Sequence, residues 1–131
     1  LNDKTYKYFF IVENNLPTGF IKVRNVSVDE YSLENVLELE KIYILPAEKG
    51  KGIGKKAMNE LITIAREEKK EYIFLGVIDT NLPAIQFYEK IGFKFYSKTR
   101  LTIPYFKEHL KGMNKMFLRL TRNIISTTRK R

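Results

Sequence analysis

The sequence predicts a single α/β (α+β) domain built on a mixed sheet of about six strands, with helices packed on its faces. Three observations lead to this fold class. A β-hairpin pattern opens the chain, a strand, loop, helix, strand order follows in the middle, and two further strand patterns come near the end. The length of 131 residues and the hydrophobic content of 44% are enough for one packed core and not for two.

The first two predicted strands form a hairpin. Residues 6–13, YKYFFIVE, and 19–27, GFIKVRNVS, are rich in aromatic and β-branched residues, which favour strands. We expect a loop between them because the connecting residues favour turns, namely Asn14, Asn15, Pro17 and Gly19.

A third strand is predicted over residues 36–45, VLELEKIYIL, and ends at Pro46. Strict alternation of side chains along this segment divides them between two faces. On this pattern Glu40 lies on the same face as Ile42 and Ile44.

The remaining elements alternate between helix and strand. From Ile53 to about Lys69, apolar residues recur at spacings of three and four, which predicts an amphipathic helix. The apolar run YIFLGVI indicates a strand buried on both faces, so the unit around the helix is a parallel crossover. We expect strands over 72–78, 93–103 and 115–121 and a second helix over 81–90, ended by Gly92.

The composition excludes several classes of protein. The chain has no cysteine and one histidine, His109, so a disulfide framework, a cysteine nucleophile and a metal site have little to be built from, and we expect no metal. No apolar stretch is long enough for a membrane helix and no export signal opens the chain, so we expect a cytoplasmic protein without a membrane partner. Much of the net charge of +9 comes from the C-terminal end, where we separate a basic tail, 123–131, from the domain, 1–122.

A glycine-rich basic loop comes directly before the first predicted helix. Gly50, Gly52 and Gly54 would allow positive φ and close approach of a phosphate to the backbone amides of the helix N-terminus. The spacing fits neither a Walker A loop nor a dinucleotide fingerprint, because Lys55 is followed by Lys56 and not by a hydroxyl residue, and no glycine stands three positions after Gly52. From the loop alone, a solvated turn is an equally good interpretation.

Two segments together carry a more specific signal. The segment 38–58, ELEKIYILPAEKGKGIGKKAM, and the segment 81–96, NLPAIQFYEKIGFKFY, resemble the two signature motifs of the GNAT family of N-acetyltransferases. The family's phosphate loop reads Gln/Arg-x-x-Gly-x-Gly/Ala, and here Lys49 replaces the first residue. The second family motif is matched by Asn81, Ala84, the Phe87-Tyr88 pair, Lys90 and Gly92-Phe93.

The resemblance has consequences for the fold. It covers roughly residues 6–120 and implies a mostly antiparallel sheet with helices on both faces. The family's fold starts with one more strand and two helices, and none of these is visible before Tyr6, so we expect the sequence to be N-terminally incomplete. Within the family, the residues of the two motifs are most similar to those of the PaiA-type polyamine acetyltransferases.

The resemblance also implies acetyl-CoA as cosubstrate. The backbone of residues 42–44 would pair with the pantetheine arm like an added strand, and the amides of the glycine loop would hold the diphosphate. Lysines near the loop would meet the phosphates or be merely solvated. The implied cofactor-binding residues are Ile42, Tyr43, Ile44, Lys49, Gly50, Lys51, Gly52, Ile53, Gly54, Lys55, Asn81, Ala84, Phe87, Tyr88 and Lys90.

Two residues are candidates for acid and base catalysis. An amine acceptor is protonated near neutral pH and needs a base, for which Glu40 matches the position in similar polyamine acetyltransferases. Glu38 is the alternative base, and either glutamate could instead be an ordinary surface residue. Tyr88 matches the family's general acid for the departing thiolate, although an aromatic residue at helical spacing is by itself more often part of the core.

The expected partner is a small-molecule amine, such as the polyamine spermidine. A protein amine or an aminoglycoside-like molecule is also compatible with the sequence. Two rival functions remain, a non-catalytic acetyl-CoA-binding domain and a basic nucleic-acid-binding module, for which the tail and the aromatic residues of YKYFF would supply charge and stacking. We regard nucleic acid as the less favoured partner because a solvated basic terminus is commoner. The sequence is silent on oligomeric state, and many GNAT proteins are dimers, so the resemblance allows a homodimer.

Overall fold

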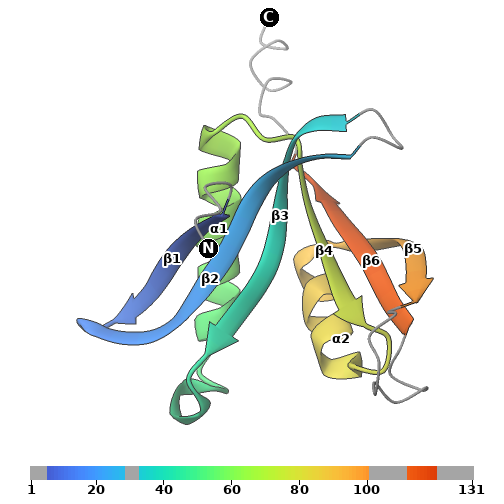
Figure 1. Cartoon of the computed structure of the whole chain (residues 1–131). Coiled ribbons are helices and arrows are strands. Elements are labelled where there is room, and N and C mark those ends of the chain that lie inside the picture. Colours follow the sequence, from blue (N-terminus) through green and yellow to red (C-terminus); the bar gives the residue numbers. More distant parts are fainter. Residues whose placement is uncertain (1–5, 29–32, 101–111, 121–131) are drawn as a thin grey trace, which may run out of the picture.

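The computed structural model describes residues 6–28, 33–100 and 112–120 (Figure 1). His109, the tail 123–131, the end of the strand predicted over 93–103 and the last residue of the strand predicted over 115–121 lie outside these ranges. In the described part of the chain no helix is both long and apolar enough to cross a membrane. The elements are β1 (Tyr6–Glu13), β2 (Leu16–Val28), β3 (Leu33–Ile44), the short 3-10 helix η2 (Pro46–Glu48), α1 (Ile53–Glu67), β4 (Tyr72–Ile78), α2 (Leu82–Ile91), β5 (Lys94–Arg100) and β6 (Gly112–Arg119).

The strands form one six-stranded sheet in the order β1-β2-β3-β4-β6-β5. Four of the neighbouring pairs are antiparallel, and only β3 and β4 are parallel. Helix α1 connects these two strands, which is the crossover unit that the sequence predicts. The predicted mixed, mostly antiparallel sheet is therefore confirmed.

The two described α-helices cover the same face of the sheet, which differs from the expected placement of helices on both faces. Figure 1 shows α1 behind β2 and β3, and α2 behind β4. Ile73, Leu75 and Val77 of β4 point to this side and belong to one core cluster with residues of α1, against which residues of α2 pack. The opposite face of the sheet carries a group of aromatic rings from β4, β5 and β6, namely Tyr72, Phe74, Tyr96 and Phe117.

The turn of the β1–β2 hairpin is tighter than the sequence predicts. It consists of Asn14 and Asn15, whose φ angles of 52° and 66° place both in the left-handed region that asparagine tolerates. Pro17 and Gly19 therefore belong to β2 and not to a loop. A two-residue turn of this kind suits the twist of paired strands, which explains why β2 begins earlier than residue 19.

A β-bulge at Glu40 interrupts the alternation of β3. Lys22 of β2 pairs with Lys41, but the next residue, Val23, pairs with Leu39, so Glu40 is an extra residue on β3. As a result Leu39 and Ile42 both contact the helix-side core. The predicted strict alternation along residues 36–45 is therefore wrong.

Gly19 permits a close approach of β2 to β3. A Cβ atom at this position would lie 2.0 Å from the carbonyl oxygen of Tyr43, which belongs to the backbone and cannot turn away. We expect Gly19→Ala to lower the free energy of unfolding by roughly 1–3 kcal/mol, the usual cost of overpacking. Urea unfolding would measure this loss. Leu16→Ala, at an exposed position of the same hairpin, is the control, and an equally small loss in both variants would contradict the expectation.

Candidate active site

Strands β3 and β4 separate after a short paired stretch. Their ladder runs only from Val36 to Leu39 on β3 and from Tyr72 to Leu75 on β4. Both strands continue beyond it, β3 to Ile44 and β4 to Ile78, and Figure 1 shows them diverging toward their carboxyl ends. Among the described residues, the edge of β3 from residue 40 to 44 that faces β4 therefore has no strand partner. A ligand with amide groups could pair with this edge.

The glycine loop leads from the end of β3 to the N-terminus of α1. Gly50 and Gly52 have φ angles of 81° and 79°, and a Cβ atom at either would have open space around it. Gly52 is the N-cap of α1 and, lacking a side chain, makes no capping hydrogen bond. The first intrahelical bond runs from the Lys56 amide to the Gly52 carbonyl, so the preceding amides are available for an anion.

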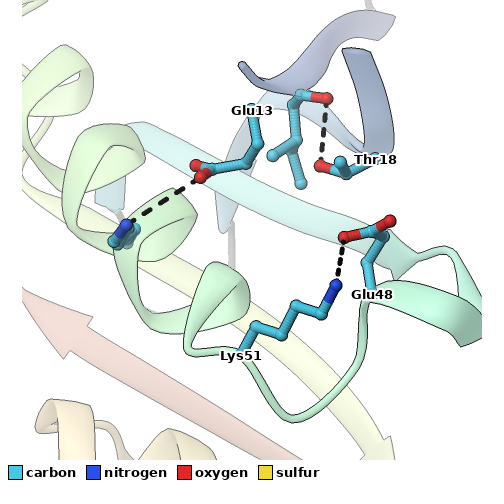
Figure 2. A network of polar contacts seen from close by, with 6 residues as sticks. Glu13, Thr18, Glu48 and Lys51 are labelled. Atoms are coloured by element: carbon cyan, nitrogen blue, oxygen red, sulfur yellow. Dashed lines mark hydrogen bonds and ion pairs between the residues drawn. The ribbon is translucent and has the colours of Figure 1, made fainter.

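The charges around this helix end are also suited to an anion. The first turn of α1 contains no acidic residue, although acidic residues stabilise a helix N-terminus, and instead contains Lys55. In the described part of the chain, Lys49 and Lys55 make no ion pair with another residue. Two cations nearby are paired: Lys51 Nζ lies 3.2 Å from Glu48 Oε1 (Figure 2), and Lys56 Nζ lies 3.9 Å from Glu13 Oε1.

Helix α2 carries the second group of predicted site residues. Asn81 caps the helix, because its Oδ1 accepts a hydrogen bond of 3.3 Å from the amide of Ala84. The Tyr88 ring lies between the rings of Phe87 and Phe93, with centroids at 5.3 Å and 5.6 Å. Burial raises the pKa of the Tyr88 phenol above its ordinary value of 10.0, since desolvation disfavours the phenolate.

The two glutamates of β3 have different surroundings. Glu38 lies next to β2 and accepts a hydrogen bond from Arg24 Nε at 2.5 Å, in a pair that raises the pKa of the arginine. Glu40 is exposed, occupies the bulge and makes no ion pair within the described ranges. The sequence does not predict Arg24 as a site residue. Its pairing with Glu38 depends on the register between β2 and β3, and no local sequence pattern gives that register.

The other predicted site residues lie along the same elements. Ile42, Tyr43 and Ile44 are on the unpaired stretch of β3, Ile42 facing the core cluster and Tyr43 the opposite side, where its ring lies 5.6 Å from that of Phe20. Ile53 is buried at the start of α1, and Lys90 is exposed at the end of α2. Gly54 and Phe87 are brought into direct proximity, although they belong to different helices and different motifs.

Comparisons with known proteins agree with this architecture. Residues 1–93 match the family model described as the acetyltransferase (GNAT) family. An uncharacterized N-acetyltransferase of Methanocaldococcus jannaschii is 31% identical over 87 residues, which cover 66% of this chain and 38% of that protein. The spermine/spermidine N(1)-acetyltransferase of Bacillus subtilis is 34% identical over 68 residues, covering 51% of this chain and 45% of that protein. The chain thus spans less than half the length of these two relatives.

A solved structure shows the same fold at low sequence identity. The ribosomal-protein-S18-alanine N-acetyltransferase from Escherichia coli superposes with a TM-score of 0.76 at 21% identity, over 92% of this chain and 73% of that one. The likeness in fold extends beyond the residues that the family model matches. With the family model covering well over half of the chain, the protein belongs to the acetyltransferase (GNAT) family.

Proposed function

We propose that this protein is an acetyl-CoA-dependent N-acetyltransferase that moves the acetyl group to a primary amine by direct attack. The observation that carries the proposal is the N-terminus of α1, which has no side-chain cap and a basic instead of an acidic first turn. A helix start of this kind is poorly suited to stabilising itself and well suited to a bound diphosphate.

The residues of the two motifs fit acetyl-CoA. The amides of Ile53, Gly54 and Lys55 would hold the diphosphate, with Gly50 and Gly52 giving it access to the backbone. The pantetheine arm carries amide groups that can pair with the unpaired edge of residues 42–44. When bound, acetyl-CoA supplies the activated acetyl group, and the protein supplies orientation and proton transfer.

Tyr88 is the proposed general acid. A thiolate leaving group requires a proton, and a phenol can donate it only while it is protonated. Burial raises the pKa of Tyr88, so the proton remains on the phenol throughout the neutral range. The position of Tyr88 on α2, packed against the core cluster, holds its ring in one place.

Glu40 is the proposed base. A primary amine has an ordinary pKa of about 10.4 and must lose a proton before it attacks. Glu40 is exposed at the point where β3 leaves β4, whereas Glu38 is engaged by Arg24. We therefore assign the base to Glu40 and a charge-pairing role to Glu38.

Replacement of the two glutamates distinguishes these roles. We expect Glu40→Gln to lower kcat/KM at neutral pH by about 100-fold, the usual contribution of a general base, and to restore part of the rate at alkaline pH, where the amine is deprotonated without help. Glu38→Gln is the matched control and should change the rate much less. Steady-state kinetics as a function of pH would measure both, and the reverse order of effects would assign the base to Glu38.

The acceptor that we propose first is a polyamine such as spermidine. Two similarities support this choice: the match to the spermine/spermidine N(1)-acetyltransferase of B. subtilis, and the resemblance of the two motifs to those of PaiA-type polyamine acetyltransferases. A panel that contains spermidine, a peptide with a free amino terminus and an aminoglycoside would rank the acceptor classes by kcat/KM. A higher value for the peptide or the aminoglycoside would replace the polyamine assignment.

A further inference from the structure

The third glycine of the loop has a different structural role from the first two. Gly54 is the second residue of α1 and does not have positive φ, so its backbone conformation is open to any residue. A Cβ atom added there would lie 3.5 Å from the ζ carbon and 3.6 Å from an ε carbon of Phe87. The ring of Phe87 therefore lies against the first turn of α1, in space that a larger side chain at position 54 would occupy.

Phe87 links two parts of the site that have separate tasks. On one side it contacts the helix start that would hold the diphosphate, and on the other its ring lies 5.3 Å from that of Tyr88. Tyr88 is in turn fixed by the Phe93 ring at 5.6 Å. Backbone hydrogen bonds do not fix the separation of α1 and α2. The two helices lie in different connections between strands, and the β3–β4 ladder ends at Leu39 and Leu75.

We infer that Phe87 is a positioning residue that sets the distance between the diphosphate-binding turn of α1 and the proton donor Tyr88. This inference rests on the proposed function. Because a displacement of about 1 Å in a reacting group can cost roughly 100-fold in rate, a side chain that fixes the separation of the two helices affects turnover without touching the acetyl group. Phe87 should therefore act on kcat more than on acetyl-CoA binding, which differs from the cofactor-binding role that the family resemblance implies for it.

Truncation of the ring is the first test. We expect Phe87→Ala to lower kcat by about 10-fold or more, with the acetyl-CoA dissociation constant changed less than about 3-fold, since the amides of α1 remain in place. Phe87→Leu keeps most of the side-chain volume and should recover most of kcat. Leu82→Ala, at an exposed position of the same helix, is the matched control. An unchanged kcat in Phe87→Ala, or a loss confined to binding, would overturn the inference.

A size exchange tests the contact itself. Gly54→Val alone should push the ring away and lower kcat, whereas in the double variant Gly54→Val/Phe87→Ala the added methyl groups enter the space of the missing ring. We expect the double variant to have a higher kcat than Gly54→Val and a urea midpoint above the value that additive changes would give. Additive effects on both quantities would show that the residues do not act through each other.

Failure of the proposed function gives a different pattern from failure of this inference. If the wild-type protein transfers no acetyl group to any amine, the proposed function fails. The urea midpoints then still test the contact between Gly54 and Phe87: non-additive midpoints support a contact that positions α2 on α1, and additive midpoints overturn that contact. If the wild-type protein is active but Gly54→Val and Phe87→Ala have additive effects on kcat and on the urea midpoint in the double variant, only the inference fails.

Discussion

Tyr88→Phe is expected to reduce kcat by about 100-fold or more while leaving acetyl-CoA binding unchanged, the range in which a positioned general acid contributes. The substitution removes one oxygen atom and keeps the ring between Phe87 and Phe93. Packing is therefore preserved, and the lost rate reports on the proton alone. Stopped-flow measurement of thiol release together with calorimetric binding of acetyl-CoA would separate the two effects.

The pH dependence gives an independent check of the same role. An acid acts in its protonated form, so activity falls as the pH rises through its pKa. Because burial raises the pKa of Tyr88 above 10.0, the decline should lie above that pH, and it should be absent from the residual activity of Tyr88→Phe. A decline at the same pH in both proteins, or unchanged kcat in the variant, would remove Tyr88 from the mechanism.

Gly52→Asp is expected to weaken the binding of acetyl-CoA strongly, at a modest cost in stability from the positive φ of position 52. Aspartate is one of the few residues that adopt the left-handed conformation of position 52, although with some strain, and its Cβ would meet no atom within 4 Å. Its carboxylate would nevertheless occupy the anion site, and like charges about 4 Å apart near a protein surface repel by roughly 4 kcal/mol, so affinity should fall at least about 100-fold. Calorimetric titration would measure the affinity and urea unfolding the stability.

Gly52→Asn is the matched control for this experiment. Asparagine has nearly the same shape and also tolerates the conformation, but it carries no charge. We expect it to bind acetyl-CoA more weakly than the wild type and much more tightly than Gly52→Asp. Equal affinities for Asp and Asn would exclude the electrostatic explanation, and wild-type affinity in both would exclude the loop as the diphosphate site.

Much of the fold could be predicted from local sequence patterns. The buried strand Tyr72–Ile78 has the predicted bounds because a continuous apolar run flanked by polar residues leaves little choice of register. Helix α1 ends two residues earlier than expected, at Glu67, and α2 is bounded by the predicted Asn81 and Gly92. The predicted alternation of β3 is wrong because it depends on contacts between strands. The bulge at Glu40 is defined by the pairing of β3 with β2, so the spacing of residues within β3 alone does not indicate it.

In the candidate site, too, local motifs could be predicted from the sequence and contacts between elements could not. The loop glycines and the Phe87-Tyr88 pair are contiguous motifs, so they could be found in the sequence. The pairing of Arg24 with Glu38 and the proximity of Phe87 to Gly54 join residues from different elements. Such contacts are fixed by the register of the sheet and the packing of the helices, which explains why local patterns did not indicate them.

Acetyl transfer to an amine is the activity that separates the proposed enzyme from a non-catalytic acetyl-CoA-binding domain. The protein would be incubated with acetyl-CoA and the amine panel, and the products analysed by mass spectrometry, with Tyr88→Phe in parallel. We expect an acetylated amine that forms only when acetyl-CoA and wild-type protein are both present, and far less of it with the variant. Intact acetyl-CoA and unmodified amines throughout the panel, with a folded protein that binds acetyl-CoA, would contradict the proposed N-acetyltransferase activity and favour a non-catalytic acetyl-CoA-binding domain.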